Sequence, residues 1–171
     1  MAAKMDLLVA PSTGHILAAA LRNNTAGPTP DAAALVGAGL LLRDPENGDT
    51  LITLPPEHLA VQSVDLRDDV LLTARNFELV DNLPELKNEL VATALALDGT
   101  NITVTVDDPA PEGGTIVWVY IEGGVQPIVQ KVEIAKTLTT ASEPLALPPG
   151  DYRALVLPPG YRLEIVEISV T

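Results

Sequence analysis

Apolar and polar residues alternate most regularly in the C-terminal half of the chain. In residues 102–106 the sequence Ile-Thr-Val-Thr-Val places apolar side chains on one side of an extended strand and threonines on the other. Residues 115–121 are apolar on both sides, which is typical of a central strand covered on both faces. The apolar positions of residues 128–134 mark a further strand, with Lys131 and Glu133 on its opposite side.

Two similar turn sequences follow. Leu-Pro-Pro-Gly-Asp-Tyr at residues 147–152 is repeated in part as Leu-Pro-Pro-Gly-Tyr at residues 157–161. Because both contain turn-forming proline and glycine, they predict a strand between them, over residues 152–157.

The last strand changes the phase of its apolar residues. Leu163 and Ile165 share one phase, whereas Ile168 and Val170 share the opposite one. An extra residue in one strand of a pair produces such a change, so we expect a β-bulge near 166–167.

The first half of the chain predicts two hairpins. The first joins residues 5–10 to residues 15–21 through Pro-Ser-Thr-Gly. The second joins residues 39–43 to residues 50–54 through a turn that contains Asn47-Gly48, two residues that tolerate a positive φ.

Residues 31–43 have two interpretations. Asp31 could cap a helix that runs through Val36, but Gly37 and Gly39 would each cost about 1 kcal/mol inside a helix. We therefore favour a strand that begins at Gly39.

Further short elements complete the first half. Strands are predicted over residues 60–66, 70–75 and 77–80. Residues 84–97 predict a short helix begun by Asn82, because Leu83, Leu86, Leu90 and Val91 recur at helical spacing before residues 93–97 become strand-like.

This organisation predicts an all-β protein of two domains. Residues 1–85 would form a smaller hairpin-rich β domain, a region for assembly or interaction, and residues 86–171 a β-sandwich.

The C-terminal half resembles the immunoglobulin-like and fibronectin-III-like sandwiches. From about residue 90 to residue 171 it has seven short strands at a spacing of about ten residues, with Trp118 in the third and Gly-Asp-Tyr at 150–152 leading into the sixth. The resemblance implies that Trp118 is the core tryptophan and that Tyr152 ties the preceding connection to the sandwich as a tyrosine corner. The cysteines of the inter-sheet bridge are absent from this sequence.

The amino-acid composition limits the classes of partner that this protein can be expected to bind. With 10 Lys and Arg against 23 Asp and Glu, the net charge is −13, which would repel nucleic acid and anionic membranes. Aromatic residues are only 3%, so extended aromatic binding platforms are not expected. No apolar run reaches the ~20 residues that span a bilayer, and no signal peptide is evident. We expect a soluble protein that is made in the cytoplasm. The alternative location is a virion or another assembled particle.

The residues that could carry chemistry do not form a recognisable motif. His15 and His58 lack metal-ligand spacing and suit a surface or cap position, and no serine lies in a Gly-x-Ser-x-Gly turn. Two groups in loops have the hard oxygen atoms that calcium prefers, although neither has EF-hand spacing. These are Asp65, Asp68 and Asp69, and Asp98, Asn101, Asp107 and Asp108. Solvated loop carboxylates are the simpler interpretation, so we predict no catalytic, cofactor-binding or metal-binding residue.

The resulting hypothesis is a non-catalytic structural or protein-interaction subunit, an accessory component of a larger assembly that associates with itself or with other proteins. The alternative is a module that binds carbohydrate or another small ligand through the loops of the sandwich. An enzyme that uses scattered carboxylates is the third hypothesis.

Overall fold

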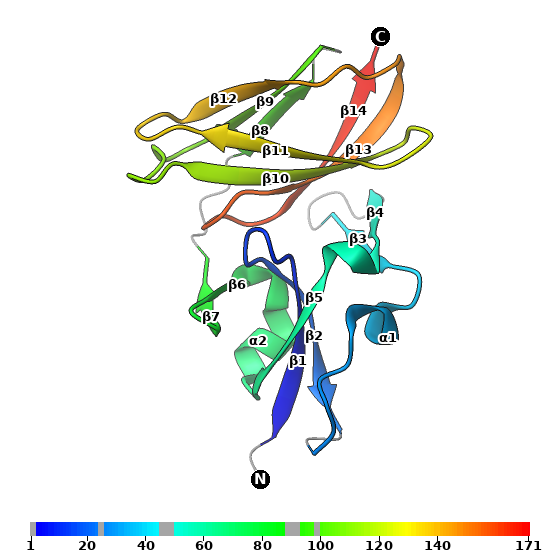
Figure 1. Cartoon of the computed structure of the whole chain (residues 1–171), viewed down its shortest axis with the longest axis vertical. Helices are drawn as coiled ribbons and strands as arrows, with labels where there is room; N and C mark the ends of the chain where they lie inside the picture. The colour runs from blue at the N-terminus through cyan, green and yellow to red at the C-terminus, as the bar shows by residue number, and fades with distance from the viewer. Residues whose placement is uncertain (1–2, 24–25, 45–49, 88–92, 98–99) are drawn as a thin grey trace. The chain divides into compact units, whose positions relative to one another are not determined.

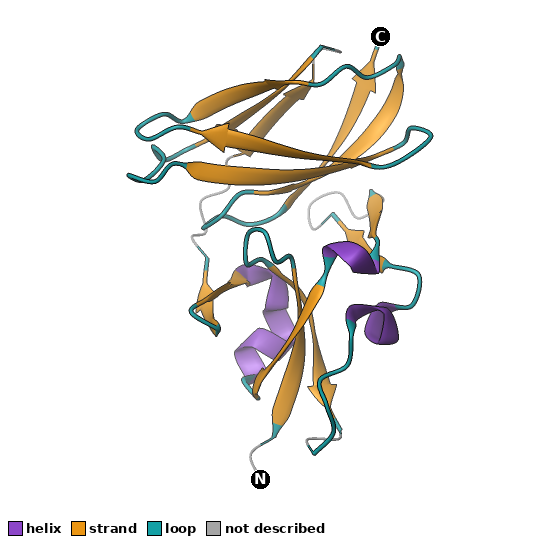
Figure 2. Cartoon of the chain, viewed as in Figure 1, coloured by secondary structure: helices purple, strands orange, loops and turns teal. Residues whose placement is uncertain are grey.

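The structure is a computed structural model that describes residues 3–23, 26–44, 50–87, 93–97 and 100–171. Antiparallel strands in several sheets predominate, and the helices are short (Figure 2). The all-β prediction is therefore confirmed. No helix in these described ranges is long and apolar enough to cross a membrane.

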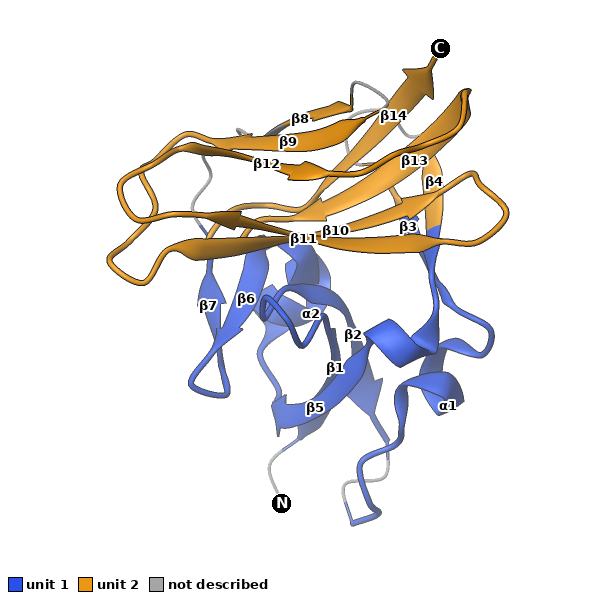
Figure 3. Cartoon of the chain, turned by 45° about the horizontal axis from the view of Figure 1, so that its top comes forward, with its two compact units in different colours: residues 1–42, 53–87 blue, residues 43–52, 88–171 orange. Residues whose placement is uncertain are grey.

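The chain forms two compact units (Figure 3). The first contains Met1–Leu42 and Thr53–Lys87, and the second contains Arg43–Ile52 and Asn88–Thr171. The second unit thus includes a ten-residue segment from the first half of the sequence. The domain boundary between residues 85 and 86 stays a prediction.

The first unit is built on a three-stranded antiparallel sheet in the order β2-β1-β5. Its strands are β1 (Lys4–Val9), β2 (Ile16–Arg22) and β5 (Ala60–Asp65). The first predicted hairpin is confirmed, with a shift of register between Leu8 and Val9. Apolar side chains of β1 and β2 form its core with residues from the following elements, namely Met5, Leu7, Val9, Ile16, Val70, Ala74 and Phe77.

Further short elements belong to this unit. They are α1 (Ala32–Val36), the 3₁₀ turns η1 (Pro56–His58) and η2 (Ala74–Asn76), α2 (Asp68–Thr73), and the hairpin of β6 (Phe77–Val80) and β7 (Leu83–Leu86).

Residues 31–43 contain both predicted elements, first a short helix and then a strand. Asp31 caps α1 by accepting a hydrogen bond from the Ala34 amide at 2.7 Å, and Gly37 ends the helix with a φ of +62°. β3 (Leu40–Arg43) then pairs with β4 (Leu51–Leu54), which confirms the strands of the second hairpin. The predicted Asn47-Gly48 turn lies outside the described residues.

The strand predicted over residues 70–75 is wrong, because this stretch is helical. Two carboxylates, Asp68 and Asp69, open α2, where the N-terminal end of a helix favours negative charge. The apolar residues have helical spacing, since Val70 and Ala74 lie four apart and are both buried.

The helix predicted to begin at Asn82 is also wrong. Asp81 and Asn82 have φ values of +48° and +64°, and they form the two-residue turn that joins β6 to β7. Positive φ at both central positions suits the twist of a hairpin. Residues 93–97 form a strand as predicted, while Leu90 and Val91 lie outside the described residues.

Among the described residues from Thr93 onward, the second unit has seven strands in two antiparallel sheets (Figure 1). One sheet has the order β12-β9-β8 and the other β11-β10-β13-β14. The strands are β8 (Thr93–Leu97), β9 (Asn101–Val106), β10 (Thr115–Glu122), β11 (Ile128–Ile134), β12 (Thr140–Pro144), β13 (Gly150–Leu157) and β14 (Glu164–Val170).

The two sheets of this unit share one core. Alternate residues of β9, β10, β11 and β13 are buried together, namely Ile102, Val104, Val106, Val117, Val119, Ile121, Val132, Ile134, Tyr152, Ala154 and Val156. The prediction that β10 is covered on both faces is confirmed, because residues 117–121 are all buried.

Trp118 lies on the other side of β10. Since Val117 and Val119 point into the core, Trp118 between them points to the outer face of the four-stranded sheet. There it stacks on Tyr120, with ring centroids 6.0 Å apart and an angle of 9° between the rings. Trp118 is only 5% exposed, but its place differs from the core position that the resemblance implied.

The β-bulge predicted near residues 166–167 is wrong. β13 and β14 pair in unbroken register from Gly150–Val170 to Val156–Glu164. The change of phase arises because Ile165 is buried on the outer face, whereas Val170 lies in the core.

Candidate functional sites in the two units

A groove of about 440 Å³ lies at one end of the outer face of β13 and β14 in the second unit. It is lined by residues from both strands and from the β10–β11 turn, namely Gly123, Asp151, Tyr152, Arg153, Glu167, Ile168 and Ser169.

Charged side chains form a row across this face. Arg153 lies opposite Glu122 on one neighbouring strand and opposite Glu167 on the other. Its Nη2 atom is 3.4 Å from Oε1 of Glu122. In the next row, the Ser169 hydroxyl donates to the Asp151 carboxylate at 2.6 Å. The groove is therefore lined by two acidic groups, Asp151 and Glu167, by the guanidinium of Arg153 and by the hydroxyl of Ser169.

The margin of the groove is bound to residues 50–51 of the same unit. Arg153 donates from Nη1 to the carbonyl oxygen of Leu51 at 2.6 Å, and the Thr50 hydroxyl donates to Oε1 of Glu167 at 3.0 Å. Thr50 is buried. Two of the charged groups thus hold a segment that is distant in sequence.

Gly123 allows the β10–β11 turn to approach β13. Its φ is +124°, and a Cβ atom there would lie 2.5 Å from the carbonyl oxygen of Asp151. A larger residue at this position would have to push the turn away from the groove.

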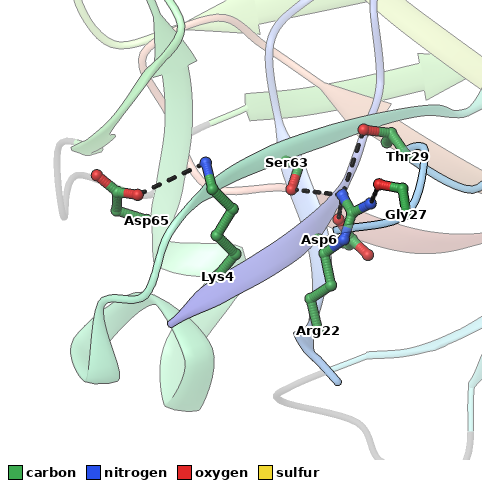
Figure 4. A network of polar contacts seen from close by, with 7 residues as sticks. All are labelled: Lys4, Asp6, Arg22, Gly27, Thr29, Ser63 and Asp65. Carbon is green, nitrogen blue, oxygen red and sulfur yellow. Dashed lines mark hydrogen bonds and ion pairs between the residues drawn. The ribbon is translucent and has the colours of Figure 1, made fainter. Parts of the chain in front are cut away.

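The first unit has a polar network centred on Arg22 (Figure 4). Its Nη1 atom lies 2.8 Å from Oγ of Ser63 and 3.3 Å from both Oδ1 of Asp6 and Oγ1 of Thr29, and Nη2 donates to the carbonyl oxygen of Gly27. The Arg22 and Asp6 side chains are 8% and 7% exposed. The guanidinium therefore ties all three strands of the sheet to the loop after β2.

A cavity of about 280 Å³ adjoins this network. Its lining includes Asp6, Leu21, Arg22, Gly27, Pro28 and Leu35. Because the guanidinium already holds four protein oxygen atoms, we interpret the network as a structural clamp rather than as a ligand site.

The structure does not gather the candidate calcium ligands in the residues it describes. There, no three His, Asp or Glu side chains come together as a metal site. Asp65 pairs with Lys4 at 3.7 Å, and Asp69 pairs with Arg67 at 2.7 Å. The hydrogen bond from Arg67 lowers the pKa of Asp69.

The other group of candidate ligands divides in a similar way. Asp108 accepts a hydrogen bond from the Tyr161 hydroxyl at 3.2 Å, and its backbone amide lies 3.1 Å from the same oxygen. Asn101 donates to the hydroxyl of Thr100. Asp98 lies outside the described residues.

The two histidines occupy different environments. His15 is fully buried, contrary to the expectation of a surface position, and its Nδ1 atom lies 2.8 Å from the hydroxyl of Thr13 in the β1–β2 turn. His58 is half-buried at the end of η1.

Sequence reasoning missed the charged residues that hold each unit together. Asp6 lies between Met5 and Leu7 in an apolar strand, and Arg153 precedes the apolar run 154–157. A charge in a buried strand needs a partner, so each position carried a signal for an internal contact. The identity of the partner could not be read from local sequence.

Comparison with protein-family models, curated proteins and solved structures gives no match to this chain.

Proposed function

We propose that this chain is a non-catalytic protein-interaction subunit that assembles with copies of itself, as a component of a larger assembly in the cytoplasm or in a particle such as a virion. Its second unit would be an immunoglobulin-like or fibronectin-III-like sandwich. Two observations support that fold: the strand orders β12-β9-β8 and β11-β10-β13-β14, and the hydrogen bond from the Tyr152 hydroxyl to the carbonyl oxygen of Pro148 at 2.7 Å.

The observation that carries the functional proposal is the exposed apolar margin of the outer face of the four-stranded sheet. Trp118 and Tyr120 are buried on this face. Ile116 precedes them on the same side of β10 and is 48% exposed, and Val129, opposite Tyr120 on β11, is 39% exposed. An apolar face that continues to an exposed edge is typical of a surface that meets another protein.

The test is the mass of the full chain in solution. We expect light scattering after size-exclusion chromatography to give a mass above the 18.0 kDa of one chain, and the mass should rise with protein concentration. Ile116→Ser should lower the assembled fraction. Val125→Ser is the matched control, because Val125 is fully exposed in the β10–β11 turn. A mass of one chain at every concentration would contradict the proposal.

A second candidate function rests on the groove. Asp151, Arg153 and Ser169 present the hydrogen-bonding groups that hold a sugar or another small polar ligand. Tyr152 offers no exposed ring for stacking, because its side chain is in the core. Calorimetric titration with a panel of monosaccharides tests this function, and saturable heat that Asp151→Ala removes would favour it over assembly.

A further inference from the structure

The strand β11 is an open edge of the four-stranded sheet. Among the strands that the structure describes, it pairs only with β10. Its core face carries Val132 and Ile134, whereas Lys131 and Glu133 are exposed on its outer face. An edge strand presents unpaired backbone groups to which another strand can be added.

Building on the proposed function, we infer that a second copy of this chain adds its own β11 antiparallel to this edge, about a two-fold axis at Val132. Lys131 of each copy then lies directly opposite Glu133 of the other. The contact is self-complementary, because one symmetry operation forms both ion pairs. It joins two four-stranded sheets into one sheet of eight strands.

The charges select this register. If the axis passed through Lys131, the two ammonium groups would face each other, and like charges directly opposite are unfavourable. A shift of one residue would place the core face of one strand on the outer face of the other. With the axis at Val132, core residues of one copy continue those of the other, and the charges alternate in sign.

The net charge of the chain explains why this edge is preferred. Two copies of a molecule with a charge of −13 repel each other unless the contact supplies cations. The opposite edge, β14, carries Glu164 and Glu167 and no cation, and β12 carries Glu143 and ends at Pro144. The β8 edge has no charge to set a register.

The edges of the first unit offer no such pairing. β5 carries only Asp65 as a charged residue, and the one cation of β2, Arg22, is committed to the buried network. β11 is therefore the edge at which lysine and glutamate alternate on an exposed face.

Charge exchange on the full chain tests this interface. The variants are Lys131→Glu, Glu133→Lys and the double exchange Lys131→Glu/Glu133→Lys, which keeps the net charge of the parent. Lys136→Glu is the matched control, because Lys136 is exposed, lies outside β11 and pairs with Glu112. The dimer dissociation constant is measured by sedimentation equilibrium at near-physiological salt.

We expect the parent to dimerise and each single exchange to weaken the dimer by about tenfold or more, since two attractive cross-strand pairs become repulsive. The double exchange should restore association to within about threefold of the parent, and Lys136→Glu should leave it unchanged. Circular dichroism spectra should stay those of the parent, because the exchanged side chains are exposed.

The failures are distinguishable. Assembly of the parent that neither single exchange weakens, or that the double exchange does not restore, would overturn this interface and leave the proposed function standing. A parent that stays monomeric at all concentrations would overturn both.

Discussion

In the first unit, a buried guanidinium holds three strands and a loop together, whereas in the second unit the two sheets meet through aliphatic side chains. Arg22 contacts oxygen atoms of Asp6, Ser63, Thr29 and Gly27. In the second unit, the shared core is almost entirely valine, isoleucine and alanine, and its buried tyrosine keeps its hydroxyl on a backbone carbonyl. In the first unit, directional polar contacts are thus added to an apolar core.

The difference has a consequence for how each unit responds to substitution. A hydrogen-bonded charge network depends on every partner, because a remaining buried charge is costly. An aliphatic core loses stability in proportion to the volume removed. The five substitutions below test this contrast, from the largest expected effect to the smallest.

Trp118→Ala should lower the free energy of unfolding of the second unit by about 3–5 kcal/mol, because it removes the largest buried side chain of the outer face. Denaturant titration followed by circular dichroism measures the change. Trp118→Phe is the control and should lose much less. An unchanged midpoint, together with solvent-exposed tryptophan emission in the parent, would show that this face is not packed.

Arg22→Met should destabilise the first unit by about 3 kcal/mol, since it leaves the carboxylate of Asp6 buried without its guanidinium. The double variant Asp6→Leu/Arg22→Met should recover most of that loss, because it removes both charges together. Urea titration of the three proteins measures the coupling. Equal stability of the single variant and the parent would refute the clamp.

Tyr152→Phe should cost about 1 kcal/mol, because the ring stays in the core and only the hydrogen bond to Pro148 is lost. The melting temperature measures this change. Tyr120→Phe provides the comparison on the outer face. A loss of stability as large as that of Trp118→Ala would contradict the assignment of a single hydrogen bond to this hydroxyl.

Tyr161→Phe should change the response of the second unit to alkali. Burial raises the pKa of Tyr161, and the charges of Asp108 and Asp107 raise it further. The unfolded chain then loses the phenol proton at a lower pH than the folded protein, so stability is present below the ordinary value near 10 and falls as pH rises above it. Melting between pH 8 and pH 11 should fall less steeply in the variant; equal slopes would contradict the assignment.

Asp69→Asn should have the smallest effect on stability of the five substitutions, and the effect should appear at acid pH. The hydrogen bond from Arg67 lowers the pKa of Asp69, so its contribution to stability is present above the ordinary value near 4 and is lost as pH falls through the lowered pKa. Because the pair is exposed, the change should be small. Acid titration of both proteins should give a slightly shallower loss in the variant, and a steeper one would reverse the sign of the effect.

The regular strands of the second unit could be predicted because their alternation is strong. β9 and β10 occur where Ile-Thr-Val-Thr-Val and the run around Trp118 indicated them, and the Tyr152 contact is the one that the resemblance implied. The bulge near 166–167 was wrong because a sheet with two apolar faces shows two phases without an inserted residue. Trp118 is buried, as the apolar run predicted, but it lies on the outer face of the four-stranded sheet and not between the two sheets, because both faces of that sheet are apolar.

The short elements of the first unit were harder to predict. Residues 68–73 contain apolar neighbours that suit a strand or a helix, and the acidic start of α2 together with packing of Val70 decides for the helix. Leu83 and Leu86 have helical spacing by coincidence, and the left-handed Asp81-Asn82 turn makes them part of a hairpin.

The candidate sites depended on contacts between residues far apart in sequence. Arg22 meets Ser63 across 41 positions, and Arg153 meets Leu51 across 102. Neither Ser63 nor Leu51 is indicated as a partner by sequence spacing or by a motif. Both sites could therefore be identified only from the folded structure.

By itself, the sequence determined the all-β class, the absence of cysteine chemistry, the strongly acidic charge and most strand positions, because periodicity and composition act over neighbouring residues. Only the tertiary structure decided which face Trp118 occupies, which groups surround Arg22, and that residues 43–52 belong with the C-terminal strands. These depend on how sheets pack and on which distant side chains satisfy a buried charge. A charged residue in an apolar strand indicates that a partner is needed, but the neighbouring sequence does not identify that partner.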